Sequence, residues 1–518
     1  MRILLGVALG GAALALHVVV QLVGFEGSLD GDDHIPLFVA AAVRAGARAY
    51  IDIFDYGNPL RWWLSYLGLL ASHDRTIGEV VIAVALKTAG IGAVFFIAWT
   101  LVRSWAASAI AAFIVMLVLL PYHGYGAEKF VIYPVAVIAG WMYARKQVAP
   151  WMLGVMVVTA FLFRHDHGVW VGLFVALVMA TGPRPVVRSF VECGLAALAT
   201  LAPWLWWLHS TEGVFQYFDG RASFSVPLGL LLDRPLFRLW RASPAETAAV
   251  WLWHLAWVGA IVGFVVALRR HRREAVLLAL MTGIMGIGIM RDEVRVEEGS
   301  PLWVPLWIWL VWTARGRVMR TAAYTLAVVI VGAVLVSRDV PDRLRAMTLE
   351  RGGLLARARN AVDFHTSTDP LAMYVGPGDN ERLLIRYVAE CLEEDDRVWE
   401  TSAWFPLPYY SNRRPAWHVE WQLGFKRDDE SQRTFLEWIR RQSVPLIIVR
   451  YRDADPFSVF DGYPHVRQYV ADRYVRLTSP GFRPFSEANN IQLLVDSTRM
   501  PGGRFEPLDL PCPAAPAS

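Results

Sequence analysis

The chain has 518 residues, is 55% hydrophobic with a mean hydropathy of +0.37, and carries a formal net charge of +4. A soluble globular protein of this length is not so apolar, and the lack of a Lys- or Arg-rich arm argues against a nucleic-acid-binding protein. Cys391 and Cys512 lie in the polar C-terminal part and could pair, although no spacing argues for it. With Cys193 they indicate neither a disulfide framework nor a zinc site.

Apolar runs of roughly 20 residues, the length that spans a hydrocarbon core, recur from the N-terminus to about residue 336. The first run is long for the apolar part of a signal peptide, so we expect it to remain as the first span. The pattern predicts a polytopic α-helical membrane protein with about 11 transmembrane helices, several of them short. The expected spans cover residues 3–24, 77–101, 105–121, 130–143, 151–163, 168–180, 190–208, 249–268, 275–290, 302–312 and 322–336.

Basic residues fall in alternate connections between these spans, namely at Arg103, 145–146, 184–188, 269–273 and 315–320. The excess of Lys and Arg marks the cytoplasmic side of a membrane protein. The opposite, outer side then receives a large first loop, 25–76, the connections at 122–129, 163–168, 209–248 and 291–300, and everything after about residue 338.

Two short segments do not fit a simple span. The apolar run 60–71 is too short to cross and must begin and end outside, so we expect a helix that lies along the outer interface. The segment 151–180 must cross twice, which places the polar turn 163–168 within membrane depth. Polar backbone is tolerated there only inside protein or beside a water-filled cavity.

The composition changes after residue 336. Residues 1–337 form the expected transmembrane domain, residues 338–500 an extracytoplasmic α/β domain, and residues 501–518 a disordered proline-rich tail. Helical spacing over 381–394, 433–442 and 465–474 alternates with strand-like runs at 397–403, 445–451 and 475–479. This alternation predicts a small three-layer domain.

Charged groups are concentrated on the outer side. Placing a charged side chain within the membrane costs free energy, so such residues tend to mark substrate paths. A carboxylate can act as general base toward a hydroxyl, while arginines and histidines can hold a phosphate leaving group. We therefore expect a cavity at the outer leaflet for transfer of a group from a lipid phosphate. The residues are Asp30, Asp32, Asp33, Asp52, Asp55, His123, Glu128, Arg164, His165, Asp166, His167, Asp219, Arg221, Arg291, Asp292, Glu293, Arg295, Glu297 and Glu298.

The order of these features resembles a known superfamily. One span, an outer loop with the acidic pair Asp32–Asp33, the segment "DIFDYGNPL", further spans and an outer α/β domain are similar to the GT-C polyprenyl-phosphate-sugar-dependent glycosyltransferases. These include protein mannosyltransferases, aminoarabinose transferases and arabinofuranosyltransferases. "FRHDHGVW" and "RDEVRVEEGSPLW" resemble motifs of some bacterial members. The sequence "DDH" departs from the family, which often has an aromatic residue shortly after the pair.

The resemblance implies transfer of a sugar from a polyprenyl-phosphate carrier to a glycan, glycolipid or protein hydroxyl, outside the bacterial cytoplasmic (inner) membrane. Asp32 would be the base, with Asp30 or Asp33 as alternatives, and Asp33 and Asp55 would position substrates. No metal ligands are assigned, and a divalent cation, Mg²⁺ or Mn²⁺, stays open as a cofactor. The implied substrate-binding residues are Arg164, His165, Asp166, His167, Arg291, Asp292 and Arg295.

Other interpretations of the same residues remain. The acidic loop could be solvated, with Asp30 capping a helix, and 164–167 could be a purely structural buried cluster. Residues 291–298 could form an exposed loop of ion pairs. A transporter or flippase would need polar groups through the membrane and ideally an inverted repeat. A non-catalytic envelope scaffold would leave the acids and cations dispersed.

Overall fold

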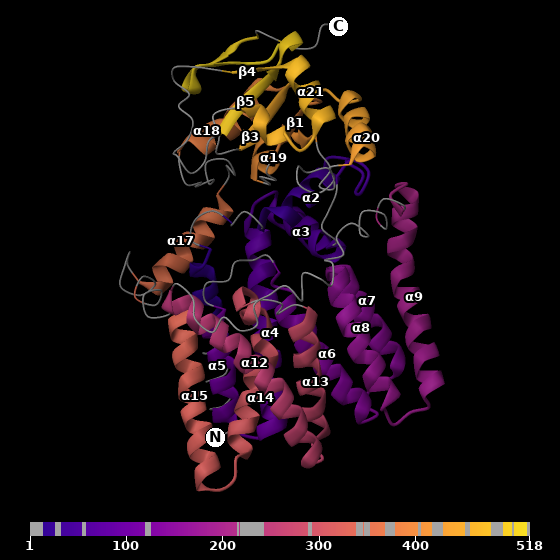
Figure 1. The fold of residues 1–518 in the computed structure, drawn as a ribbon, viewed down its shortest axis with the longest axis vertical. Coiled ribbons are helices and arrows are strands. Elements are labelled where there is room, and N and C mark those ends of the chain that lie inside the picture. Colours follow the sequence, from indigo (N-terminus) through magenta and orange to yellow (C-terminus); the bar gives the residue numbers. More distant parts are fainter. Residues whose placement is uncertain are drawn as a thin grey trace.

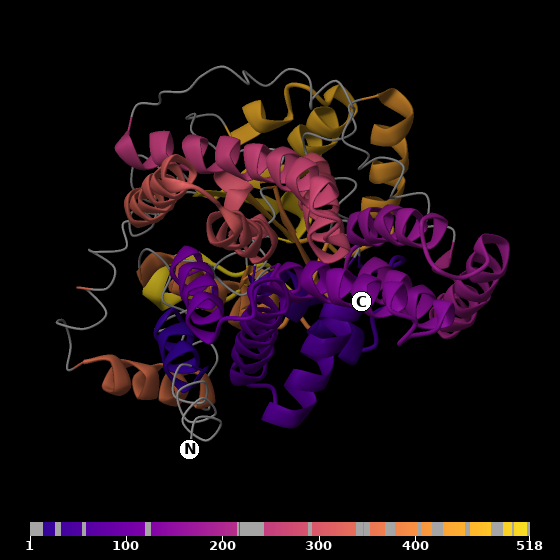
Figure 2. The ribbon, with the colours of Figure 1, turned by 90° about the horizontal axis from the view of Figure 1, so that it is seen from below.

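The computed structural model describes residues 14–25, 29, 33–53, 58–119, 126–214, 217, 243–288, 293–337, 345, 353–367, 379–401, 406–416, 428–450, 456–477, 491–499 and 502–514. A bundle of long helices carries a smaller domain with a β-sheet at one end (Figure 1). Seen from below, helices α12 to α15 lie on one side of the bundle and helices α4 to α9 on the other (Figure 2).

Each expected span overlaps a helix in the described part of the chain, although of the first span, 3–24, only residues 14–24 are described. Three of these helices, α4, α9 and α12, are long and apolar enough to cross a membrane by themselves. The number of crossings stays a prediction. The helices are Leu14–Val23, α4 Ile77–Val102, α5 Trp105–Val118, α6 Lys129–Ala144, α7 Pro150–Phe163, α8 His165–Ala180, α9 Val186–Ser210, α12 Pro244–Arg269, α13 Arg273–Gly288, α14 Ser300–Thr313 and α15 Arg317–Ser337.

Three of the basic connections contact one another at the end of the bundle away from the sheet. Arg145 Nη2 lies 2.7 Å from Glu274 Oε1, and Arg273 Nη2 donates to the Thr181 carbonyl at 2.9 Å. Arg184 Nη2 donates to the carbonyl of Val148 at 3.2 Å. The loops that the charge pattern assigns to one side therefore do lie together.

The first loop forms two helices between the bundle and the sheet domain, α2 His34–Arg44 and α3 Pro59–Ser72. Helix α3 matches the short interfacial helix expected at 60–71. One face of it buries Arg61 and Trp62, while Leu67 and Leu70 on the other face are exposed. Eight of the eleven residues of α2 are buried, so this helix is packed on all sides.

The C-terminal domain consists of a five-stranded mixed sheet with helices on both faces. The strand order is β2-β1-β3-β5-β4; β1 is parallel to β2 and β3, and β5 is antiparallel to β3 and β4. Its elements are α18 Asp379–Cys391, β1 Arg397–Glu400, α19 Pro406–Ser411, β2 Arg414–Pro415, α20 Asp429–Arg440, β3 Leu446–Arg450, α21 Pro464–Arg473, β4 Tyr474–Arg476 and β5 Ile491–Asp496. Helix α17, Leu354–Thr366, precedes the domain.

Alternation along β3 explains the three layers. Ile447 and Val449 pack with helices α20 and α21, whereas Leu446 and Ile448 pack with α18 on the other face. The three helices and three strands expected in this domain are present. Strands β2 and β5 were not expected.

The prediction of a disordered tail is wrong for residues 502–514. Strand β6, Arg504–Phe505, pairs with β7, Leu510–Pro511, and a disulfide joins Cys512 to Cys391 at the end of α18. Phe505, Leu508 and Leu510 are buried in the same core as α18. Apolar side chains set among prolines thus anchor a segment whose composition suggests disorder.

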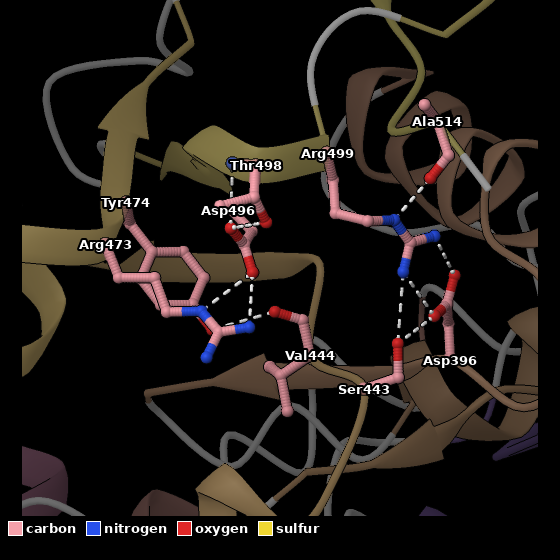
Figure 3. A network of polar contacts seen from close by, with 9 residues as sticks. All are labelled: Asp396, Ser443, Val444, Arg473, Tyr474, Asp496, Thr498, Arg499 and Ala514. Atoms are coloured by element: carbon pink, nitrogen blue, oxygen red, sulfur yellow. Dashed lines mark hydrogen bonds and ion pairs between the residues drawn. The ribbon is translucent and has the colours of Figure 1, made fainter. Parts of the chain in front are cut away.

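A buried ion pair joins the residue before β1 to the short 3₁₀ helix Ser497–Arg499 that follows β5 (Figure 3). Arg499 donates to both carboxylate oxygens of Asp396, at 3.1 and 3.0 Å, and Ser443 donates a hydrogen bond to the same carboxylate. Arg499 Nε also donates to the carbonyl of Ala514, which ties the tail to this pair.

Asp396→Asn is expected to lower the free energy of unfolding of this domain by roughly 3–5 kcal/mol, because it leaves the Arg499 charge buried without its carboxylate. Chemical denaturation followed by hydrogen–deuterium exchange of the β1 and β3 amides measures the change. Glu390→Gln, which removes an exposed pair with Arg386 on α18, is the control and should cost about 0.5 kcal/mol or less. Equal losses of unfolding free energy in the two variants would contradict a stabilising role of the buried Asp396–Arg499 pair.

Candidate functional site

The polar turn at 163–168 is a sharp reversal at the bundle end that faces the sheet domain. Helix α7 ends at Phe163 and α8 begins at His165, so Arg164 alone connects them, with an extended backbone (φ −167°, ψ 136°). The helices approach closely here, because a Cβ on Gly168 would lie 2.6 Å from the Phe161 Cα. Only glycine allows this reversal to place its polar side chains beside the start of α6.

We call Glu128, Lys129, Tyr133, Arg164, Asp166, His167 and Glu298 the α6–α8 cluster. His167 is fully buried; its Nδ1 lies 2.7 Å from the Tyr133 hydroxyl and its Nε2 lies 4.0 Å from Glu128 Oε1. Arg164 Nη2 donates to Asp166 Oδ2 at 2.7 Å. Acids, cations and an imidazole from separate segments thus meet in one place.

The late loop joins this cluster through Glu298. Its Oε1 accepts from Lys129 Nζ at 2.7 Å, and both side chains are buried. The loop forms a 3₁₀ helix, η2 Glu293–Gly299, directly before α14, and Glu297 is buried as well. Glu297 and Glu298 are therefore not part of an exposed ion-pair loop.

Glu128 has the surroundings of a proton-transfer group. Burial raises the pKa of its carboxyl group, and the positive charges of Arg61 and Lys129 offset part of that rise. A carboxyl with a raised pKa, held near an imidazole, suits acid–base work. From the sequence, Glu128 was expected only as one of the charged residues of the outer side, with no role of its own.

His165 faces a different group from its neighbours. Its Nε2 lies 2.5 Å from the Tyr217 hydroxyl, and its ring packs edge-on against Phe161. The four residues 164–167 are therefore divided, with three in the α6–α8 cluster and His165 beside the aromatic groups of the first loop and α9.

The first loop reaches the α6–α8 cluster through Arg61 of α3. Arg61 forms a buried ion pair with Oε1 of Glu79 on α4. The second carboxylate oxygen of Glu79, Oε2, accepts a hydrogen bond from Ser65 Oγ at 2.7 Å. The positive charge of Arg61 also acts on Glu128. Residues near position 60 and position 128 thus share one electrostatic environment.

Asp33 lies in a second buried group with Lys87 of α4. Both side chains are fully buried and attract each other, and Lys87 Nζ also donates to Gln21 Oε1 at 3.0 Å. Lys87 follows Glu79 by eight residues, about 12 Å along the helix. Lys87 was not expected among the site residues, although a single lysine within an apolar helix is itself a signal of function.

Of the other predicted site residues, the structure describes Asp52 and the backbone of Arg295. Asp52 is paired with Arg48; burial would raise the pKa of its carboxyl, but hydrogen bonds from Arg48 hold it below its usual value. Arg295 belongs to η2, and its side chain is not described. Asp30, Asp32, Asp55, His123, Asp219, Arg221, Arg291 and Asp292 lie outside the described residues.

Among the described residues, no group of three or more His, Cys, Asp or Glu is arranged to hold a metal ion. This statement does not extend to the first-loop acids Asp30, Asp32 and Asp55, because they lie outside the described residues.

The fold is similar to two crystal structures of ArnT from Cupriavidus metallidurans. The apo structure matches with a TM-score of 0.51 at 13% identity, over 94% of this chain and 98% of that chain. The structure bound to undecaprenyl phosphate matches with a TM-score of 0.50 at 13% identity, over the same shares. No protein-family model matches the chain, and no curated protein matches it. At 13% identity the likeness concerns the fold alone, and it extends over nearly the whole of both chains.

Proposed function

We propose that the chain transfers a sugar from a polyprenyl-phosphate carrier to an acceptor hydroxyl at the outer face of the bacterial cytoplasmic membrane. The observation that carries this proposal is the shared fold, which extends over nearly the whole of ArnT, including a structure bound to undecaprenyl phosphate. The α6–α8 cluster supports it, because cations and acids from distant segments converge at one end of the bundle. A non-catalytic scaffold would not need that convergence.

The proposed reaction is a single displacement. Asp32 accepts the proton of the acceptor hydroxyl, the hydroxyl oxygen bonds to the anomeric carbon, and the bond from that carbon to the phosphate oxygen breaks with its electrons on the phosphate. One displacement inverts the anomeric centre. Asp33 and Asp55 position the substrates.

The lipid phosphate is proposed to meet Arg164 and His167 from one side and Arg291 and Arg295 from the other. His165, Asp166 and Asp292 are proposed to contact other parts of the substrates. Arginine suits this role because its planar fork pairs with phosphate oxygens. Arg164 is bound to Asp166 in the structure and retains a partly exposed side chain, so it can pair with a second anion.

Two features support an outward-facing site. The Lys- and Arg-rich connections lie at the opposite end of the bundle from the C-terminal domain. The C-terminal domain also holds the Cys391–Cys512 disulfide, and disulfides persist mainly in oxidising compartments outside the cytoplasm.

Undecaprenyl phosphate is expected to stabilise the purified protein in nanodiscs, by about 2.7 kcal/mol when its concentration is a hundred times the dissociation constant. Thermal unfolding with undecaprenol, which has the same tail and no phosphate, is the control. Arg164→Met should weaken the stabilisation, and Arg188→Met, an exposed residue at the other end of the bundle, should not. Equal stabilisation by undecaprenol would contradict recognition of the phosphate.

A further inference from the structure

The C-terminal domain contacts the first loop at the residue that follows the acidic pair. Helix α19 packs against α2, and Tyr410 Oη lies 3.2 Å from Nε2 of the fully buried His34. The rings of Tyr409 and Tyr410 also pack on the imidazole, with centroids 6.0 and 5.3 Å away. A residue 376 positions away in the chain thus holds the start of α2.

The opposite end of α2 is held by the same domain. Its C-cap is Ala45, whose carbonyl accepts a hydrogen bond from Arg414 Nη2 at 3.1 Å. Arg414 belongs to β2, which directly follows α19. The segment from α19 to β2 therefore contacts α2 at both ends.

The position of α2 determines the position of Asp33. Asp33 is the N-cap of α2 and already has helical backbone angles (φ −66°, ψ −21°), so its backbone moves with His34. Its carboxylate is buried and attracted to Lys87 of the bundle. Asp33 consequently lies between an attachment to the bundle and an attachment to the C-terminal domain.

We propose that α19 is a positioning element for the acidic pair, and that the Tyr410–His34 contact holds the residues at the start of α2 in the geometry that sugar transfer needs. The proposal rests on the function proposed above. Tyr410 and His34 are positioning residues and do not touch the reacting atoms. Errors of about 1 Å in the placement of reacting groups can reduce rates by two orders of magnitude.

Tyr410→Phe is the test, because it removes the hydroxyl and keeps the ring that packs on His34. The matched control is Tyr387→Phe, which removes another buried tyrosine hydroxyl of the same core, one that lies on α18 and donates to the Pro511 carbonyl at 2.8 Å. We expect Tyr410→Phe to lower kcat by roughly 10- to 100-fold with KM for the polyprenyl-phosphate sugar within about twofold. Tyr387→Phe should retain the kcat of the original protein.

Hydrogen–deuterium exchange gives a second readout that needs no substrate. Amides of 35–45 should exchange faster in Tyr410→Phe than in Tyr387→Phe, while amides of α18 should not. Unchanged kcat and exchange in Tyr410→Phe would overturn the proposal, as would equal losses in both variants. If the original protein transfers no sugar, the proposed function fails, and the exchange data alone then decide whether α19 fixes α2.

Discussion

Replacing Asp32 with asparagine is expected to slow sugar transfer by roughly 10²- to 10⁴-fold, the range that a positioned general base contributes. Asparagine has the size of aspartate but cannot accept the proton of the acceptor hydroxyl. Binding of undecaprenyl phosphate should persist, because the proposed phosphate ligands lie elsewhere in the chain. Initial rates of polyprenyl-phosphate release from the sugar-loaded carrier measure the effect.

Asp30→Asn and Asp33→Asn are the matched comparisons, since either residue could take the place of Asp32. Asp33→Asn should also lower thermal stability, because it leaves the buried Lys87 without the attraction of the Asp33 carboxylate. Full activity in Asp32→Asn together with a large loss in one of the other two variants would move the role of base to that residue.

The second large effect is expected at the Lys129–Glu298 pair. Either Lys129→Met or Glu298→Gln should lower the free energy of unfolding by roughly 3–5 kcal/mol, because each removes one charge of a buried ion pair. The double variant Lys129→Met/Glu298→Gln should regain much of the loss, since no buried charge of the pair remains.

Unfolding of the four proteins in a titration with a denaturing detergent gives the coupling energy of the pair. The exposed pair Arg188–Glu192, at the start of α9, is the control, and its single variants should cost about 1 kcal/mol or less. Additive losses at Lys129 and Glu298 would contradict the account that the pair ties the late loop to α6.

Apolar periodicity predicted most of the helical part of the fold. Within the described residues each expected span overlaps a helix, because a run of apolar residues bounded by charge or proline determines a helix locally. The helix α3 was also predicted as a helix that does not cross the membrane, because its apolar run of residues 60–71 is too short to span it. The alternation of helices and strands predicted the C-terminal domain for the same local reason.

Strand β5 and the ordered tail were missed for different reasons. All six residues of β5 are buried, so its sequence lacks the alternation that marks a strand with one exposed face. The tail is anchored by a disulfide between cysteines 121 residues apart, and spacing cannot reveal such a pair.

The candidate site was predicted in part. Convergence of 164–167 with the late loop was expected from the excess charge on one side, and the α6–α8 cluster has that composition. The pairing of Asp33 with Lys87, the position of Glu128 beside His167 and the contact of His34 with Tyr410 depend on tertiary packing. No local pattern carries that information.

The central claim is transfer from a polyprenyl-phosphate sugar. Its most direct measurement incubates the protein in nanodiscs with polyprenyl phosphates carrying aminoarabinose, arabinofuranose or mannose, together with an envelope extract as acceptor. The account predicts release of the free polyprenyl phosphate with at least one donor, dependent on the extract, and loss of that release in Asp32→Asn. Release with none of the donors, although undecaprenyl phosphate binds, would contradict it.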